Sequence, residues 1–234
     1  MSDRLNEVKR ELRAVAEPER VEVMQRFFRT GPGEYAEGDV LIGVRVPATR
    51  KIARAHRDLP LEEALRLLDS EIHEERLLAL LIMVDRFERD PGSREDVYEA
   101  YLANTGLVNN WDLVDSSAPA IVGGWVEDHS AEVLDRLARS ELLWERRIAI
   151  VSTLQLIRRE RLDETFHLCE LLLDDGHDLI HKACGWMLRE AGKRDERRMV
   201  EFIERHAPSM PRTMLRYAIE RLPEAERRRL MAID

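Results

Sequence analysis

The chain has 234 residues, of which 35% are charged and 6% aromatic, and its formal net charge is −9 at neutral pH. It is rich in Leu, Ala, Arg and Glu and lacks long alternations of Val, Ile and Thr, a composition typical of an all-helical protein. No run of eighteen apolar residues occurs, so a membrane-spanning helix is excluded, and the N-terminal residues lack the apolar stretch of a secretory signal.

The spacing of apolar residues predicts helices along the whole chain. Their approximate ranges, in chain order, are 3–15, 18–29, 47–57, 61–70, 73–88, 93–104, 109–126, 130–139, 143–159, 163–173, 178–191, 196–206 and 211–221. The long irregular segment TGPGEYAEGDVLIGVRVP (30–47) is rich in Gly and Pro. Charge is uneven, because residues 61–135 carry a net −13 while the segments before and after them carry +2 each.

A repeat becomes visible when helix starts are aligned. SEIHEERLLAL (70–80), SELLWERRIAI (140–150) and DGHDLIHKACG (175–185) align without gaps and place Ala79, Ala149 and Cys184 in one slot. The period is about 35 residues, the length of a helix–turn–helix unit. We therefore predict an all-α, HEAT-like repeat α-solenoid of stacked antiparallel helix pairs that form a concave groove, as a single domain over residues 1–234.

The segment NNWDLVDSSAP (109–119) departs from this repeat. The slot of Trp111 holds Arg76, Arg146 and His181 in the other units, and the slot of Asp115 holds Leu80, Ile150 and Gly185. An acid thus stands where regular units have an apolar or small residue. Within a continuous helix, Pro119 cannot donate a hydrogen bond to the carbonyl of Asp115. We therefore expect the helix to bend there, or to restart with Ser116 or Ser117 as its cap.

A carboxylate beside a helix discontinuity is a candidate functional group. Trp111 lies four residues before Asp115, so the indole and the carboxylate share one face of the helix. These residues are therefore a candidate site. The alternative is that Trp111 packs in the core and Asp115 is only solvated.

Several cations fall on the helices that the repeat predicts to be inner ones. Arg147, with Arg146 beside it, shares its slot with Lys182 in the next unit, and Arg216 lies near that slot in the last unit. A line of cations along stacked helices suits a phosphate backbone. The alternative is a set of salt bridges between neighbouring residues.

Trp186, Arg45 and Arg50 are each compatible with a functional role and with a purely structural one. Trp186 follows the small pair Cys184–Gly185, which leaves room for an indole at a surface, but it is equally a candidate core residue. Arg45 and Arg50 flank Pro47 and are able to contact a polyanion, although a structural turn is the simpler interpretation.

Other chemistries lack support in the sequence. Segment 30–47 has no GK[ST] ending and follows no strand, which argues against a nucleotide phosphate loop. HDLIHKAC (177–184) has metal-ligand spacing but lacks the Glu of HExxH and a clear fourth ligand, so we expect no metal site. Ser116 and Ser117 have no His and Asp partners at a recognisable spacing, which argues against serine catalysis.

Four segments of the chain carry a family pattern. They are GEYAEGDVLIGVRVPATRKIAR (33–54), NNWDLVD (109–115), WERRIAIV (144–151) and KACGWMLREAGKRD (182–195). In this order and with this repeat period, they closely resemble the AlkD-like DNA alkylation-repair glycosylases over nearly the whole chain. The resemblance implies an all-helical solenoid that holds duplex DNA in a basic groove and hydrolyses the N-glycosidic bond of cationic N3- and N7-alkylated purines.

The resemblance also implies roles for individual residues. Asp115 would be the catalytic carboxylate, Trp111 and Trp186 would face the sugar of the damaged nucleotide, and Arg147 would hold the adjacent backbone. Further candidate DNA contacts are Arg146, Lys182, Arg216, Arg45 and Arg50. The aromatic residue that the family has in its second helix falls on Phe27 or Phe28.

The reaction needs few groups. An alkylpurine that already carries a positive charge leaves as a neutral base without a general acid, and the remaining sugar resembles an oxocarbenium ion. One carboxylate is then sufficient to stabilise that charge and orient water, and indole faces attract cationic groups by roughly 0.5–2 kcal/mol. No metal or cofactor is required.

Two other interpretations stay open. One is a HEAT-repeat scaffold that binds a protein partner, and the other is a relative that binds DNA structures without hydrolysis. Neither predicts a loss of function specific to Asp115. The two cysteines, Cys169 and Cys184, form no disulfide framework, so we expect a cytoplasmic protein, and a solenoid of this length is expected to be a monomer.

Overall fold

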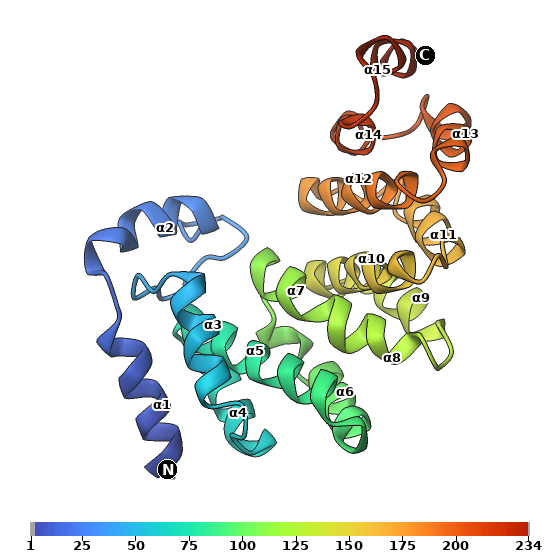
Figure 1. Ribbon diagram of the computed structural model, residues 1–234. Helices are drawn as coiled ribbons and strands as arrows, with labels where there is room; N and C mark the ends of the chain where they lie inside the picture. Colours follow the sequence, from blue (N-terminus) through green and yellow to red (C-terminus); the bar gives the residue numbers. More distant parts are fainter. Residues whose placement is uncertain (1–2, 234) are drawn as a thin grey trace. The chain divides into compact units, whose positions relative to one another are not determined.

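The computed structural model describes residues 3–233, and the regular elements in this range are helices (Figure 1). The all-α class predicted from the sequence is confirmed. Within the described range, the isolated parallel bridge between Val40 and Ile72 is the single strand-like pairing. The helices gather into two compact units, the first ending at Ser117 and the second beginning at Ala118.

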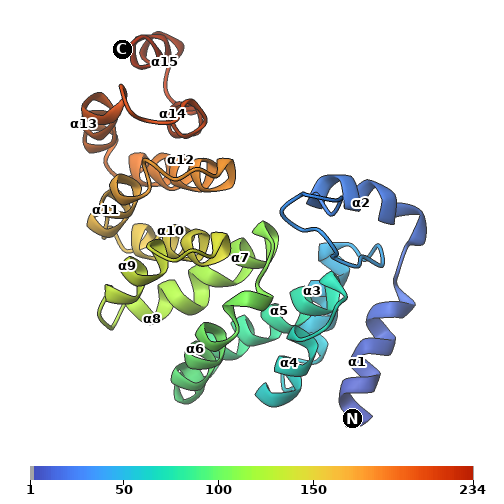
Figure 2. The same ribbon diagram turned by 180° about the vertical axis from the view of Figure 1, so that it is seen from behind.

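The first unit is organised around its fifth helix. Its helices are α1 (Asp3–Ala14), α2 (Val21–Phe28), α3 (Val46–Ala55), α4 (Leu61–Leu68), α5 (His73–Arg89), α6 (Arg94–Ala103) and nearly all of α7 (Trp111–Ala118). Short 3-10 turns lie at Pro18–Arg20, Pro91–Ser93 and Thr105–Leu107. α5 packs against α3, α4 and α6, and α1 lies beside α3 (Figure 1 and Figure 2). α5 is buried on all sides from Leu77 to Met83, which makes it the core helix of this unit.

The start of α5 is polar and yet buried. His73, Glu74, Glu75 and Arg76 are each at most 4% exposed, and each has partners on other segments. Glu75, for example, accepts ion pairs of 2.9 Å from Lys9 and from Arg13, which tie α1 to α5. Buried charges are tolerated only when they are paired in this way.

Glu74 fixes the irregular segment 30–47 to the same helix start. Its carboxylate accepts hydrogen bonds of 2.8–3.1 Å from the backbone N–H groups of Ile42, Gly43 and Val44. Gly43 has a φ of 89°, and a Cβ there would lie 2.1 Å from the carbonyl oxygen of Glu17, so this position requires glycine. Because these N–H groups already donate to Glu74, they are not available to bind a phosphate.

The second unit consists of stacked helices. They are α8 (Gly124–Val126), α9 (Glu132–Ala138), α10 (Leu143–Arg158), α11 (Asp163–Leu171), α12 (Asp178–Gly192), α13 (Glu196–His206), α14 (Arg212–Ile219) and α15 (Glu224–Met231). α10, α12 and α14 form a row in which each helix packs on the next (Figure 1). α9, α11 and α13 each pack against a member of that row. None of the helices in residues 3–233 combines the length and the apolar character needed to cross a membrane.

Small residues allow the close approach of helices in this row. A Cβ on Gly185 of α12 would lie 2.5 Å from the carbonyl oxygen of Met214 and 2.5 Å from the Cβ of Tyr217, both on α14. The neighbouring slot residue Cys184 is fully buried, as are its equivalents Ala79 and Ala149. A residue larger than glycine at position 185 would therefore collide with α14.

The repeat also appears as a repeated set of hydrogen bonds. Nη1 of Arg76 donates to the carbonyl oxygens of the residues six and five positions earlier, at 2.8 and 3.1 Å. Nη1 of Arg146 makes the equivalent bonds, at 2.9 and 3.0 Å. Each guanidinium also binds an aspartate of another segment, Asp39 at 2.5 Å or Asp175 at 2.6 Å. Segments 70–80 and 140–150 are thus equivalent in three dimensions.

The chain remains helical through Pro119. α7 continues directly into a π-helical turn, Pro119–Gly123, and then into α8. The wider π turn accommodates the proline ring without ending the helix, and such turns frequently lie at functional sites. A discontinuity is therefore present one turn after Asp115, in the form of a π turn.

The alternative in which the helix restarts at Ser116 or Ser117 is wrong, because both lie inside α7. Ser117 Oγ donates a hydrogen bond of 2.6 Å to the carbonyl of Leu113, one turn earlier, and lies 3.0 Å from the hydroxyl of Tyr101. A serine that bonds back to the preceding turn is typical of a helix interior. It therefore does not cap a new helix.

Two elements differ from the predicted ranges. The helix predicted at 18–29 is divided into a 3-10 turn and α2, with Pro18 at the first position of the turn. α15 was absent from the predicted helices because it is highly charged and buries Leu230 alone, so it shows little apolar periodicity.

Candidate functional site

The two residues singled out in NNWDLVD both lie on α7. Trp111 is the first residue of this helix and Asp115 follows one turn later. Both side chains are partly exposed to solvent. A spacing of four residues places them on the same face of the helix.

An aromatic cluster surrounds Trp111 and consists of Trp111, Phe27 and Phe28. The indole meets Phe27 edge-on, with 5.4 Å between ring centroids, and is stacked on Phe28 at 5.7 Å. Phe28 is buried, whereas Phe27 is 62% exposed. Both candidates for the second-helix aromatic therefore contact Trp111. A large exposed aromatic ring next to a partly exposed indole is a favourable surface for a ligand.

The two acids of WDLVD have different environments. Asp112 is 7% exposed, and its Oδ2 lies 2.9 Å from Nε2 of His73 on α5. Asp115 is more exposed than Asp112 and lies one turn from Trp111 on the shared face. Asp112 is thus held in a buried ion pair, while Asp115 is partly exposed to solvent.

His73 belongs to a buried charged network that the sequence pattern did not predict. Its Nδ1 lies 3.1 Å from Oδ2 of Asp39, and Asp39 also binds Arg76. Burial by itself lowers the pKa of His73, but the hydrogen bonds to Asp112 and Asp39 outweigh it and raise the pKa to about 9. Burial opposes ionisation of Asp39 as well, yet bonding to His73 and Arg76 keeps its pKa below the usual value. The available signal was the run HEER, four polar residues in a row at the start of an apolar helix.

Arg45 and Arg50 lie in the first unit, near the start of α3. Arg45 makes a two-fold hydrogen bond to Glu17, with Nε and Nη2 each 2.8 Å from a carboxylate oxygen. The hydrogen bond from Arg45 lowers the pKa of Glu17. Arg50 is exposed on α3. The bond to Glu17 gives Arg45 a structural role in the turn before α3. The residue is nevertheless exposed to solvent.

The remaining predicted cations lie in the second unit. Arg147 is 5% exposed and donates a hydrogen bond of 2.7 Å to the carbonyl of Leu179 on α12. Lys182 pairs with Asp178 one turn away, at 2.7 Å. Arg216 on α14 is exposed. Arg146 makes the repeat contacts described above, so its polar groups are largely directed to the protein itself.

Trp186 lines a pocket of about 540 Å³ between the C-terminal parts of α10 and α12. Leu154 and Ile157 contribute apolar surface. Its charged residues are three cations and one acid, Arg158, Lys193, Arg194 and Glu190, and the acid pairs with Lys193 at 2.7 Å. These cations do not stand out in the sequence, because they are not in the repeat slot of Arg147. Trp186 is partly exposed, so it is a surface residue. The alternative that it is a core residue is wrong.

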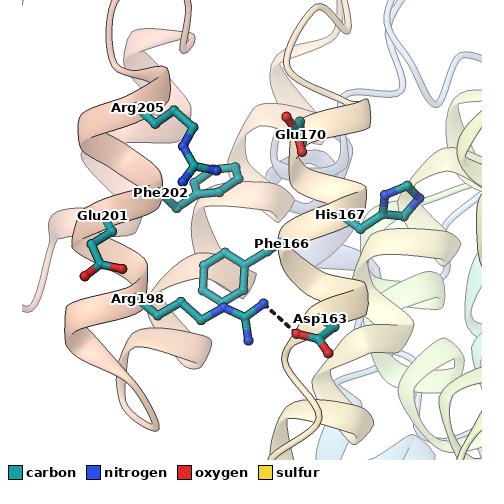
Figure 3. Close-up of a pocket in the computed structure, with 8 residues that line it drawn as sticks. All are labelled: Asp163, Phe166, His167, Glu170, Arg198, Glu201, Phe202 and Arg205. Atoms are coloured by element: carbon teal, nitrogen blue, oxygen red, sulfur yellow. Dashed lines mark hydrogen bonds and ion pairs between the residues drawn. The ribbon is translucent and has the colours of Figure 1, made fainter.

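A second pocket, of about 330 Å³, lies between α11 and α13 (Figure 3). Acids and arginines both line it: Arg198 pairs with Asp163 at 2.5 Å and lies over the ring of Phe166, 4.5 Å from its centroid. Glu170, Glu201 and Arg205 also line it (Figure 3). None of the residues predicted from the sequence takes part, so we assign it no role in the site.

The HDLIHKAC segment has structural contacts. His177 accepts a hydrogen bond from the N–H of Leu179 at the start of α12, and His181 contacts the carbonyl of Asp175. Across residues 3–233, no three His, Cys, Asp or Glu side chains are grouped as a metal ion would require. Cys184 and Cys169 are both buried and form no disulfide, and the thiol of Cys169 lies 3.7 Å from the carbonyl of Cys184.

Comparison with known proteins identifies the family. Residues 8–222 match a protein family described as DNA alkylation repair enzyme. The chain belongs to this family. Membership confirms the resemblance noted in the sequence and supports a role in DNA alkylation repair, with DNA as the substrate.

The fold agrees with this assignment. A solved structure described as a predicted DNA alkylation repair enzyme from Enterococcus faecalis superimposes with a TM-score of 0.70, covering 89% of this chain and 97% of that one. The sequence identity is 19%, so this likeness concerns the fold alone. No curated protein matches the sequence.

Proposed function

We propose that this protein is a DNA N-glycosylase that hydrolyses the N-glycosidic bond of cationic N3- and N7-alkylated purines in duplex DNA. The observation that supports this most is the contrast within WDLVD. Asp112 is buried against His73, whereas Asp115 is accessible and shares a helix face with Trp111. A water-accessible carboxylate beside an indole is the minimum that the reaction needs.

In this proposal Asp115 stabilises the developing positive charge on the sugar and orients the attacking water. No general acid is required, because a cationic alkylpurine leaves as a neutral base. The protein therefore releases bases that are already charged and retains neutral ones. It works without a metal or an organic cofactor.

Trp111 and Trp186 provide aromatic faces for the damaged nucleotide in this proposal. Trp111 is stacked on the buried ring of Phe28, and the exposed ring of Phe27 contacts it edge-on. Trp186 lies beside Arg158 and Arg194, an arrangement that suits a nucleotide with its phosphates. Lys193 also lies there, paired with Glu190 at 2.7 Å.

The DNA backbone is bound by cations of both units in this proposal. Arg147 holds the backbone next to the damaged nucleotide, Lys182 and Arg216 extend the contact along α12 and α14, and Arg45 and Arg50 add contacts near α3. Arg146 contributes less to DNA binding, because its guanidinium is hydrogen-bonded to the loop before α10. We expect the protein to act as a cytoplasmic monomer.

The experiment that tests the activity is a release assay on duplex DNA methylated at random. Free N7-methylguanine and N3-methyladenine are expected in the supernatant, while O6-methylguanine, which is neutral, is expected to stay in the DNA. Equal release of neutral and cationic bases would contradict the mechanism.

The runner-up function is DNA binding without hydrolysis, which membership of a DNA alkylation repair family supports equally well. It predicts salt-sensitive binding of duplex DNA and no free base in the same assay. The third interpretation, a protein-binding scaffold, predicts neither.

A further inference from the structure

His73 connects two parts of the first unit that the proposed site needs. Its ring nitrogens lie 3.1 Å from Asp39 in segment 30–47 and 2.9 Å from Asp112 in the first turn of α7. Its ring also packs against Phe28, with 4.7 Å between centroids, and Phe28 is the ring on which Trp111 is stacked. The imidazole is 1% exposed, so solvent does not share these contacts.

We propose that His73 is a positioning residue for Trp111, and that it acts as a buried imidazolium which holds Asp112 on one side and Asp39 on the other. The consequence for catalysis rests on the proposed glycosylase function. The effect on Trp111 does not, because it follows from contacts inside the first unit.

Geometry requires the charged form of His73. A neutral imidazole has one N–H donor, whereas both of its nitrogens here face carboxylate oxygens that accept hydrogen bonds. Only the imidazolium donates to both. Loss of the proton would leave one carboxylate facing a nitrogen lone pair in a buried site, which is strongly unfavourable.

Asp112 depends on this donor. Within residues 3–233, Oδ1 of Asp112 is buried without a hydrogen-bond partner, so its bond to His73 is the one that the carboxylate accepts there. Asp39 is less dependent, since Arg76 at 2.5 Å and the amide of Asn109 at 3.3 Å also donate to it. Deprotonation of His73 therefore acts mainly on Asp112, which follows Trp111 directly in the chain.

The surrounding charges favour the proton on His73. Asp39 and Asp112 face it directly, and Arg76 is neutralised by Asp39. The other buried acids of α5 are engaged elsewhere: Glu74 binds backbone N–H groups and Glu75 binds α1. Burial, which lowers the pKa of His73, is outweighed by its two carboxylates, and the pKa of about 9 keeps the imidazolium present at neutral pH.

The test follows His73 and Trp111 in the same sample of the full-length protein. Nitrogen NMR of the imidazole reports the proton on His73, and fluorine NMR of protein containing 5-fluorotryptophan reports each indole, with the Trp111 signal assigned by Trp111→Phe. We expect His73 to lose its proton near pH 9 and the Trp111 signal to shift with the same midpoint. Trp125, which stacks on His129 at 3.7 Å in the second unit, is the internal control and is not expected to follow that midpoint.

The Asp112→Asn variant separates positioning from a general effect of alkaline pH. Removing one of the two carboxylates is expected to lower the midpoint of His73, and the midpoint of Trp111 must move with it. If the Trp111 signal titrates independently of His73, or if His73 is neutral at pH 7, the proposal is overturned. These readouts need no DNA, so they stand even if the protein proves not to be a glycosylase.

The catalytic consequence is measured by single-turnover release of N7-methylguanine between pH 7 and 10. We expect the rate to fall by about 2- to 30-fold through the His73 midpoint, the range that corresponds to loss of an indole–cation contact. A flat rate profile over a proven titration of His73 would refute the link to catalysis. No release at any pH would refute the glycosylase function and leave the NMR result intact.

Stability provides a further check, with a definite sign. The pKa of His73 is higher in the folded protein, about 9, than its ordinary value of 6.5. The stabilisation from its proton is therefore complete below pH 6.5 and is lost as the pH rises through 9. The difference in unfolding free energy between wild type and His73→Gln should accordingly be largest at or below pH 6.5 and shrink towards pH 10. A constant difference would contradict a charged His73.

Discussion

The starts of α5 and α10 differ from the start of α7 at one repeat position. In α5 and α10 an arginine occupies it, Arg76 or Arg146, and binds two carbonyls of the preceding loop and a distant aspartate. In α7 the same position is Trp111, which turns to an aromatic cluster instead. The next residue, Asp112, connects α7 to α5 through His73. At this position, α7 therefore lacks the arginine that binds the preceding loop and has a partly exposed indole instead.

The largest expected effect concerns the regular positions. Arg76→Ala removes a cation from Asp39 where both side chains are 5% exposed, so we expect a loss of about 3–5 kcal/mol in unfolding free energy. Arg146→Ala affects a less buried pair and is expected to cost about 1.5–3 kcal/mol. Urea unfolding of both variants measures the difference. A larger loss for Arg146→Ala would show that the two starts are not equivalent.

The exceptional position is tested through its indole. Trp111→Leu is expected to slow release of N7-methylguanine by about 2- to 30-fold, because a cation–aromatic contact is lost. Trp125→Leu is the matched control, since this indole stacks on His129 and was not predicted to contact the nucleotide, and it should retain the wild-type rate. Equal rates for wild type and Trp111→Leu would return Trp111 to the role of a packing residue.

The smallest expected effect concerns the cations. Arg216→Ala should reduce the slope of log affinity for duplex DNA against log salt by about 0.9, the value for one phosphate contact. Arg197→Ala removes an exposed arginine that pairs with Glu201 within α13, and it should leave the slope unchanged. Arg147→Ala is expected to flatten the slope as well, and also to lower stability because the Leu179 carbonyl loses its donor. Identical slopes for wild type and Arg216→Ala would remove that residue from the interface.

Much of the fold was predictable, because apolar periodicity and the position of small residues are local signals. The thirteen ranges predicted from the sequence correspond to α1 to α14, with α7 and α8 inside one range, and the aligned arginines make equivalent contacts. The helix α15 was missed because its charged sequence hides the one buried residue, Leu230. The π turn at Pro119 was missed because a proline in a helix is compatible with a bend, a restart or a wider turn, and the sequence does not distinguish them.

The site was predictable in part. Trp111 and Asp115 stood out because the aligned positions of the other repeat units hold residues of a different kind. His73 and Asp39 did not stand out, because their contact with Asp112 depends on the docking of segment 30–47, which has no periodicity. Arg158, Lys193 and Arg194 were missed for a related reason, since they gather only where the ends of two helices meet beside Trp186.

The central claim is that Asp115, and not its neighbour Asp112, is the carboxylate of the reaction. The most direct test is single-turnover release of N7-methylguanine at saturating protein, with wild type, Asp115→Asn and Asp112→Asn side by side and DNA affinity measured for each. Asp115→Asn should lower the rate by about 10²- to 10³-fold with little change in affinity, as for other groups that stabilise developing charge. Asp112→Asn should lower stability and reduce the rate by a smaller factor. Wild-type release by Asp115→Asn, or a greater loss in Asp112→Asn than in Asp115→Asn, would contradict the account.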